Sequence, residues 1–296
     1  MATRNPILPS NHTLKFGLTA LMIANVCLSF GPWFVRHADV GPVASAFWRM
    51  AIATPLLMVI VRTTGQNVRL SRRQAGILLA SGIFFAADLA SWHLGIFETK
   101  LANANLLGNA ASFLLPIYGF IIAKAWPTRM QGIAITLAVL GAVLLMGRSY
   151  ELSPQNFVGD LLCLAAGVFY TAYLVMMANM RGALAPWPTL AWSTLASCLP
   201  LLAFAVVTGE TVWPTNWTPL IILAVLSQVV GQGLLIYVLG RMPPLVLGLA
   251  LLTQPIISAT IGWLAYGEVL TLLDWVGAAL IGLALILVRQ PDPVQI

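Results

Sequence analysis

The sequence predicts an all-α integral membrane protein with ten transmembrane helices, arranged as two inverted five-helix repeats. Three observations lead to this prediction. Hydrophobic residues make up 59% of the 296 residues and charged residues only 8%, the apolar residues fall into ten long runs, and the two halves of the chain match each other weakly. A soluble protein carries about 25% charged residues. The composition therefore excludes a soluble globular protein and leaves no room for a soluble catalytic domain.

Each of the ten apolar runs is long enough to cross a bilayer, whose apolar core of about 30 Å needs about 20 helical residues. Short loops rich in charged and turn-forming residues separate them, so successive helices are expected to be antiparallel neighbours. The runs lie near residues 15–36, 42–62, 74–97, 101–123, 130–147, 157–179, 187–208, 218–240, 243–266 and 272–289.

The basic residues divide unequally between the two sides of such a bundle. Eleven Lys and Arg fall on the side of the N-terminus, three fall on the other side, and Arg49 lies inside a span. Because basic loops stay in the cytoplasm, the sequence predicts that both termini are cytoplasmic. An even number of crossings agrees with that topology.

The two halves of the chain match each other at an offset of about 145 residues. Ala51 falls on Ala196, Pro55 on Pro200 and Gly132 on Gly277. The match predicts one repeat over 1–148 and a second over 149–296, within a single membrane domain. Since five is odd, the second repeat starts from the opposite side, an arrangement typical of secondary transporters. The alternative is chance similarity between two hydrophobic segments.

Four intramembrane prolines occupy matching places in the two halves: Pro55 and Pro200 in the second and seventh runs, and Pro116 and Pro255 in the fourth and ninth. A proline removes one backbone hydrogen bond from a helix. Paired interrupted helices indicate a mid-membrane binding site and hinges that open it. A packing kink without a ligand is the alternative.

Polar side chains recur along single helical faces inside the spans. Because they are costly in lipid, we expect them to turn inward, where they either bond neighbouring helices or line a wet central cavity. The sequence leaves both roles open for each residue. The candidates for substrate binding are Asn25, Trp92, Asn109, Tyr170, Gln228, Gln232 and Gln254. Trp48, Tyr173, Trp192 and Tyr237 are further ring-bearing candidates for the wall of the cavity.

Two ionisable residues lie at similar depth in neighbouring helices. Arg49 and Asp88 either form a structural salt bridge or contact a substrate carboxylate and amine, since intramembrane charges are functional candidates by default. His93 titrates near neutral pH when unperturbed, so it is either a proton-coupling group or a satisfied polar side chain.

Several function classes find no support in the residues. The net charge of +6 is spread along the chain, unlike the clustered basic face of a nucleic-acid-binding protein. A phosphate-binding loop for ATP and paired metal-ligand spacings are missing, so no cofactor is expected. The cysteines Cys27, Cys163 and Cys198 lie singly in apolar runs, as small core residues do. An enzyme is disfavoured because Ser81 and His93, twelve residues apart on one helix, are too distant to act together.

Three segments resemble a known family. Ser45–Ala53, Gln254-Pro255 through Tyr266-Gly267-Glu268, and Val276–Gly282 are similar to signatures of the drug/metabolite transporter superfamily, in particular its EamA-type exporters. Within that family the resemblance is to aromatic amino-acid exporters, with Arg49 and Glu268 as matched motif residues. The resemblance implies a central cavity lined by helices 1, 3, 4, 6, 8 and 9 in the cytoplasmic membrane of a bacterium.

The first helix offers Asn25 and Ser29 where small multidrug-resistance relatives carry a glutamate, which favours a neutral or zwitterionic cargo. We therefore expect a secondary transporter that exports small metabolites, foremost amino acids of the aromatic, Met or Thr type, by alternating access. Arg49, Asp88, His93 and Glu268 are the expected gating and charge residues. The alternatives are another cargo such as a drug or nucleotide sugar, a channel, or a membrane-embedded enzyme.

Overall fold

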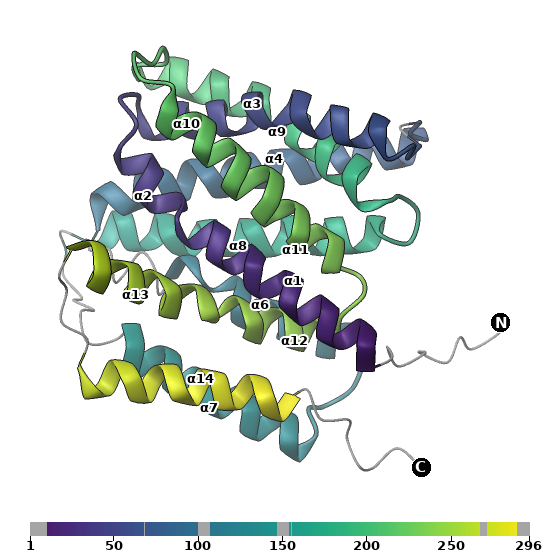
Figure 1. Ribbon diagram of the computed structural model, residues 1–296, viewed down its shortest axis with the longest axis vertical. Helices are drawn as coiled ribbons and strands as arrows, with labels where there is room; N and C mark the ends of the chain where they lie inside the picture. The colour runs from purple at the N-terminus through teal and green to yellow at the C-terminus, as the bar shows by residue number, and fades with distance from the viewer. Residues whose placement is uncertain are drawn as a thin grey trace.

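The computed structural model describes residues 11–67, 69–99, 107–146, 154, 156–266 and 271–288. All regular secondary structure in these ranges is helical (Figure 1). The helices of the first half are α1 (Asn11–Ser29), α2 (Gly31–Arg36), α3 (Pro42–Thr63), α4 (Arg72–Glu98), α6 (Ala111–Ala123) and α7 (Arg129–Met146). Those of the second half are α8 (Phe157–Met180), α9 (Pro186–Val207), α10 (Thr218–Leu223), the π-helix η2 (Ala224–Gln232), α11 (Gly233–Val238), α12 (Pro244–Leu251), α13 (Thr253–Tyr266) and α14 (Leu272–Val288).

The ten predicted crossings are all present in the described ranges. Six helical stretches are long and apolar enough to span a bilayer, and four shorter apolar helices fall in the remaining runs. Three crossings are irregular, which the hydropathy pattern does not reveal. The first breaks at Phe30 between α1 and α2, the eighth contains the π-helix η2 between α10 and α11, and the ninth breaks at Leu252 between α12 and α13.

The packing of the helices follows the duplication of the sequence. Helices at equivalent places in the two halves pack on each other: α3 on α9, α6 on α12, and α7 on α14. The contact of α4 with α8 has its counterpart in the contact of α1 with η2 and α11. Exchanging the two halves therefore reproduces the main contacts, as a two-fold arrangement of inverted repeats requires. The exact boundary between the repeats at residue 148 stays a prediction.

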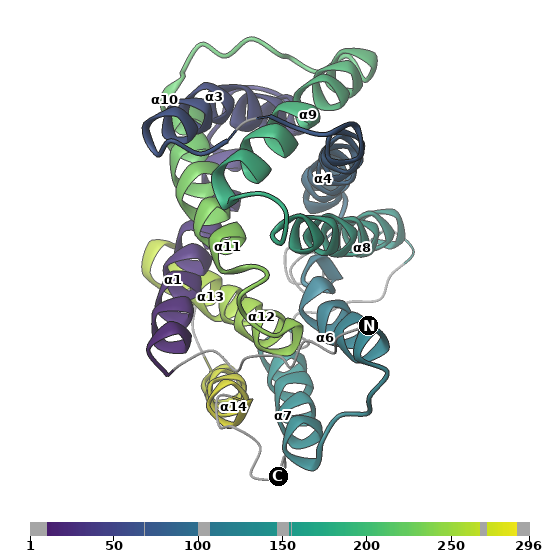
Figure 2. The same cartoon turned by 90° about the vertical axis from the view of Figure 1, so that its right-hand side faces the viewer.

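Small residues allow the closest helix contacts. On α7, Ala134, Ala138 and Ala142 recur every four residues and are buried against Ile281 and Ala284 of α14. A Cβ added at Gly141 would lie 2.7 Å from the backbone oxygen of Gly277, so only a glycine fits there. Close backbone approach through small residues is the usual way in which membrane helices associate. Figures 1 and 2 show α7 and α14 as a pair at one edge of the molecule.

The four predicted hinge prolines differ in their surroundings. Pro55, Pro116 and Pro200 lie inside α3, α6 and α9, which continue through them. Pro255 lies in the first turn of α13, just after the break at Leu252, where the missing N–H removes no helical hydrogen bond. The backbone is thus interrupted at one of the four proline sites, and the role of these prolines in bending stays a prediction.

Candidate functional site

A cavity of about 130 Å³ lies at the centre of the bundle. Its wall comes from α1 and α2, α3, α4, α6, α8, the eighth crossing, and the α12–α13 crossing. The second crossing, α3, contributes Arg49 to the wall and so joins the six crossings that the family resemblance implies. The predicted residues that line the cavity are Arg49, Asp88, Trp92, His93, Asn109, Tyr170, Gln232, Gln254 and Pro255.

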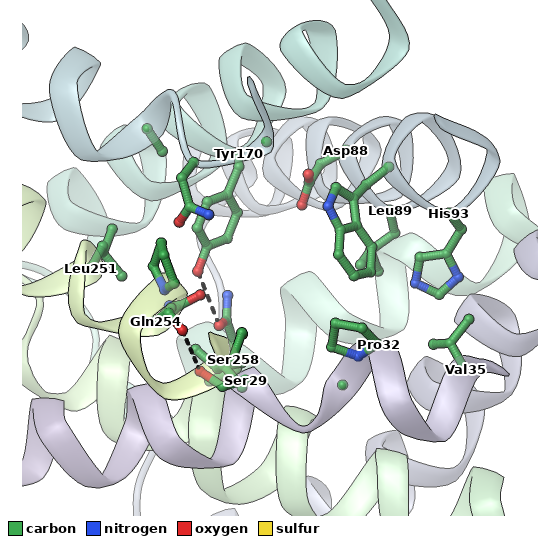
Figure 3. Close-up of a pocket in the computed structure, with 18 of the residues that line it drawn as sticks. Ser29, Pro32, Val35, Asp88, Leu89, His93, Tyr170, Leu251, Gln254 and Ser258 are labelled. Atoms are coloured by element: carbon green, nitrogen blue, oxygen red, sulfur yellow. Dashed lines mark hydrogen bonds between the residues drawn. The ribbon is translucent and has the colours of Figure 1, made fainter. Parts of the chain in front are cut away.

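The cavity extends toward one end of the bundle. Its lining runs from Tyr170 and Gln232, near the middle of their crossings, to Val35 at the end of α2. Figure 3 shows Asp88, His93 and Tyr170 on one side of this space and Ser29, Gln254 and Ser258 on the other. The end toward which the cavity extends carries the α2–α3 loop, which is the periplasmic end under the predicted topology.

Arg49 is held from behind by a chain of buried amides and hydroxyls. Its Nε donates a hydrogen bond of 3.2 Å to Oε1 of Gln228, and Nε2 of Gln228 donates one of 2.9 Å to the hydroxyl of Thr194. Gln228 and Thr194 are fully buried, and the guanidinium carbon lies 5.9 Å from the centre of the Phe85 ring. These contacts fix the direction of the side chain and leave its terminal amino groups for the cavity. Gln228 itself is outside the lining and acts through Arg49.

Asp88 faces the same cavity from α4. Its side chain makes no hydrogen bond or ion pair with any residue in the described part of the chain, although the residue is only 9% exposed. Within these ranges no salt bridge joins it to Arg49, so the salt-bridge alternative from the sequence is not what the structure contains. Two opposite charges that line one cavity without neutralising each other are costly in a membrane interior unless water or a ligand pairs them.

His93 is fully buried and joins α4 to the start of α3. Its Nδ1 lies 2.7 Å from the backbone oxygen of Pro42 and 3.1 Å from the hydroxyl of Ser45. Because a carbonyl oxygen only accepts, Nδ1 carries the proton in this arrangement. The other ring nitrogen, Nε2, is buried without a partner. In the neutral ring it is an acceptor at the wall of the cavity, and a proton-relay role for His93 stays a prediction.

The π-helix η2 carries both glutamines of the eighth crossing. Gln228 bonds Arg49, and Oε1 of Gln232 accepts a hydrogen bond of 3.3 Å from the hydroxyl of Tyr170. Nε2 of Gln232 and the hydroxyl of Ser112 are buried without partners among the described residues, and both residues line the cavity. π-Helices are rare and occur often at functional sites. The sequence placed the two glutamines on one face without revealing the change of helix type.

Asn25 lies behind the wall. Its Nδ2 donates hydrogen bonds to the backbone oxygen of Ala250 at 2.7 Å and to the hydroxyl of Thr253 at 2.8 Å. Its Oδ1 accepts a 3.1 Å hydrogen bond from Nε2 of Gln254. Asn25 is fully buried, so its amide joins α1 to the break between α12 and α13. This is the inter-helix alternative for Asn25, and the structure places it outside the cavity lining.

Two of the six ring-bearing candidates line the cavity, and four lie outside its lining. Trp92 and Tyr170 line the cavity. Tyr173 is sealed behind it, stacked on Phe85 with ring centres 4.3 Å apart. Trp48 packs on Trp213 and Trp217 and donates a 2.6 Å hydrogen bond to the backbone oxygen of Val212, which satisfies its indole outside the cavity. Trp192 and Tyr237 also lie outside the lining.

Two further predictions concern the motif residue Glu268 and the expectation of no metal site. Glu268, the acidic residue of the family motif, lies outside the described residues. In the ranges that the structure describes, no three His, Cys, Asp or Glu side chains gather as metal ligands would.

Comparison with known proteins agrees with this architecture. The chain is 25% identical over 254 residues to the threonine/homoserine exporter RhtA of Salmonella typhimurium (strain LT2), which covers 84% of this chain and 83% of that protein. It is 26% identical over 277 residues to the pseudopaline exporter CntI of Pseudomonas aeruginosa, covering 92% and 95%. A solved structure titled "Crystal structure of protein" shares the fold, with a TM-score of 0.79 at 15% identity over 95% of this chain and 98% of that one.

The family match covers both halves separately. Residues 15–147 and residues 157–290 each match the EamA-like transporter family. With ten apolar crossings built as two repeats around a polar central cavity, the chain belongs to the EamA-like transporter family.

Proposed function

We propose that this protein exports zwitterionic amino acids across the cytoplasmic membrane of a bacterium by alternating access. The observation that carries the proposal is the pair of opposite charges, Arg49 and Asp88, which line one cavity without a salt bridge between them in the described part of the chain. An amino acid presents a carboxylate and an ammonium group on one carbon. Arg49 is the partner for the carboxylate and Asp88 the partner for the ammonium group, and each charged hydrogen bond is stronger than a neutral one.

The remaining wall supports a cargo with a polar side chain. The hydroxyl of Ser112 and Nε2 of Gln232 have no partner in the part of the chain that the structure describes, and a site of this kind favours a ligand that hydrogen-bonds them. The relatives named as threonine/homoserine exporters point the same way. Threonine and homoserine are therefore the first cargoes to test, and phenylalanine and methionine test the aromatic and Met types that the family resemblance suggests.

The closed end of the bundle supports alternating access. Val61, Met180, Leu239 and Met242, at the end opposite to the α2–α3 loop, are buried in the main apolar core. Export requires a second state in which these contacts open and the periplasmic end closes. In an inverted repeat, the second half can adopt the conformation of the first and the reverse, which exchanges the open end.

The test is uptake of radiolabelled threonine by proteoliposomes, with competition by analogues that lack one charge. Arg49→Gln should weaken competition by threonine about 10- to 100-fold and leave competition by threoninamide, which has no carboxylate, unchanged. Asp88→Asn should weaken competition by threonine to a similar extent. It should leave competition by 3-hydroxybutyrate, which has no ammonium group, unchanged. Arg72→Gln, an exposed residue at the start of α4, is the matched charge control.

If either variant weakened competition by all three compounds equally, Arg49 and Asp88 would not bind the carboxylate and the ammonium group of the cargo. Absence of flux for every amino acid in the panel would refute the proposed cargo class. Repeating the uptake with and without a pH gradient tells whether transport is coupled to protons.

A further inference from the structure

A second depression, of about 680 Å³, lies on the outer surface between α6 and α7. One wall is α6, with Phe113, Ile117 and Phe120, and the other is α7, with Ile135 and Val139. Leu249 of α12 completes the lining. Figure 2 shows α6 and α7 as neighbours at one side of the bundle, away from α3, α9 and α10. We call this depression the α6–α7 groove.

The groove has the length of one membrane leaflet. It follows α6 from Ser112 to Lys124, and twelve residues of helix rise about 18 Å. Half of the apolar core of a bilayer measures about 15 Å. Because Lys124 marks the end of the helix at the membrane surface, the groove runs from that surface to the middle of the bilayer. Ile117 and Ile121, which are 52% and 67% exposed, present apolar surface along it.

The mouth of the groove is basic. Lys124 ends α6 in a left-handed backbone conformation with φ of 49°, which turns the chain away from the helix axis. Its side chain and that of Arg129, at the start of α7, are exposed. Segment 107–146 contains no Asp or Glu that would neutralise them. Trp126, 93% exposed between the two cations, is of the type that anchors at the membrane interface.

We propose that the α6–α7 groove binds one anionic glycerophospholipid of the cytoplasmic leaflet. An acyl chain lies along α6 against Ile117 and Phe120, and the phosphate lies between Lys124 and Arg129. The leaflet is the one at which the basic loops of the chain gather, and basic clusters next to spans attract anionic lipids. A groove of one leaflet's length with a cationic mouth matches the shape and charge of such a lipid.

A second copy of the chain fits the groove less well. A two-fold dimer through this face would bring Lys124 and Arg129 of both copies together without an acidic partner from segment 107–146. A partner helix would also need a complementary surface across both leaflets, whereas the groove ends near Ser112 at mid-membrane.

The test is native mass spectrometry of the delipidated full chain, titrated with phosphatidylglycerol and, separately, with phosphatidylcholine of the same acyl chains. We expect one preferred phosphatidylglycerol site. Lys124→Ala with Arg129→Ala should lower the affinity of that site about 25-fold, at about fivefold for each cation. Arg72→Ala with Arg73→Ala removes two exposed charges at the same end of the bundle and should leave the site unchanged.

A variant that fills the groove tests the acyl-chain contact. Ile117→Trp should weaken phosphatidylglycerol at the same site while both cations stay in place, and thermal unfolding in detergent verifies that each variant is folded. Equal affinity for the two lipids in the wild type would overturn the proposal. So would equal losses in the two double variants, or a wild-type dimer that Ile117→Trp dissociates.

Discussion

Replacing Asn25 by leucine tests whether its side-chain amide stabilises the fold or binds the substrate. Leucine has a similar volume, so the change removes hydrogen bonds without opening a large cavity. The amide takes part in three bonds, to Ala250, Thr253 and Gln254. Hydrogen bonds between membrane helices average about 0.6 kcal/mol, so the expected loss is about 2 kcal/mol of unfolding free energy.

The groups that remain keep the loss near this value. The hydroxyl of Thr253 still donates to the backbone oxygen of Ala250, at 2.7 Å. Gln254 lines the cavity, so its amide is not enclosed by apolar groups when Asn25 is replaced. Neither group becomes a buried polar group without a hydrogen-bond partner, which would increase the loss of unfolding free energy.

The assay is equilibrium unfolding in mixed micelles of dodecyl maltoside and SDS, paired with the binding affinity of the folded fraction for threonine. Asn25→Leu should unfold at lower SDS and bind with unchanged affinity. The hydroxyl of Thr253 accepts from Asn25 and donates to Ala250, so Thr253→Val removes two hydrogen bonds and should cost about 1 kcal/mol of unfolding free energy. Unchanged stability together with lost binding would refute the reasoning and return Asn25 to the cavity wall.

Three further predictions test the packing, the loops and the topology. Gly82→Val should destabilise the protein by about 1 to 3 kcal/mol, because a Cβ at this position lies 2.5 Å from a side chain of α9. Gly76→Ala on the same helix has open space and should be neutral or stabilising. Thermal unfolding of the two variants measures the difference. Hydrogen bonds from the α9–α10 loop, with a side-chain hydroxyl as the largest contribution, lower the pKa of Asp39. The loop should therefore be protected from hydrogen exchange at neutral pH and lose that protection as pH falls below about 4. The variant Asp39→Ala should lack the protection already at pH 7. An impermeant thiol reagent should label Trp213→Cys in intact cells and Arg69→Cys only after permeabilisation.

Each of these three has an outcome that contradicts it. Equal stability of the two glycine variants would show that α4 and α9 do not touch as described. Loop protection that does not change between pH 7 and pH 3 would show that the Asp39 carboxylate does not hold the α9–α10 loop. Labelling of both cysteines in intact cells, or of the opposite one, would overturn the topology.

Much of the cavity wall was predictable because lipid penalises polar groups wherever they occur. That rule turned Asp88, Trp92, His93 and Tyr170 inward without any knowledge of their neighbours, and the structure has them on the lining. The same rule does not say whether an inward group meets a cavity or another helix. Asn25 and Gln228 obey it and are fully buried among protein partners.

The sequence by itself determined the ten crossings and their duplication, since hydropathy is a local property that adds up residue by residue along the chain. Tertiary structure alone decided which charges are partnered, because a partner comes from a helix distant in sequence. Arg49 meets Gln228, 179 positions away, and no described residue pairs with Asp88. The break at Phe30, the π-helix and the α6–α7 groove likewise depend on how crossings pack, which no single run of residues encodes.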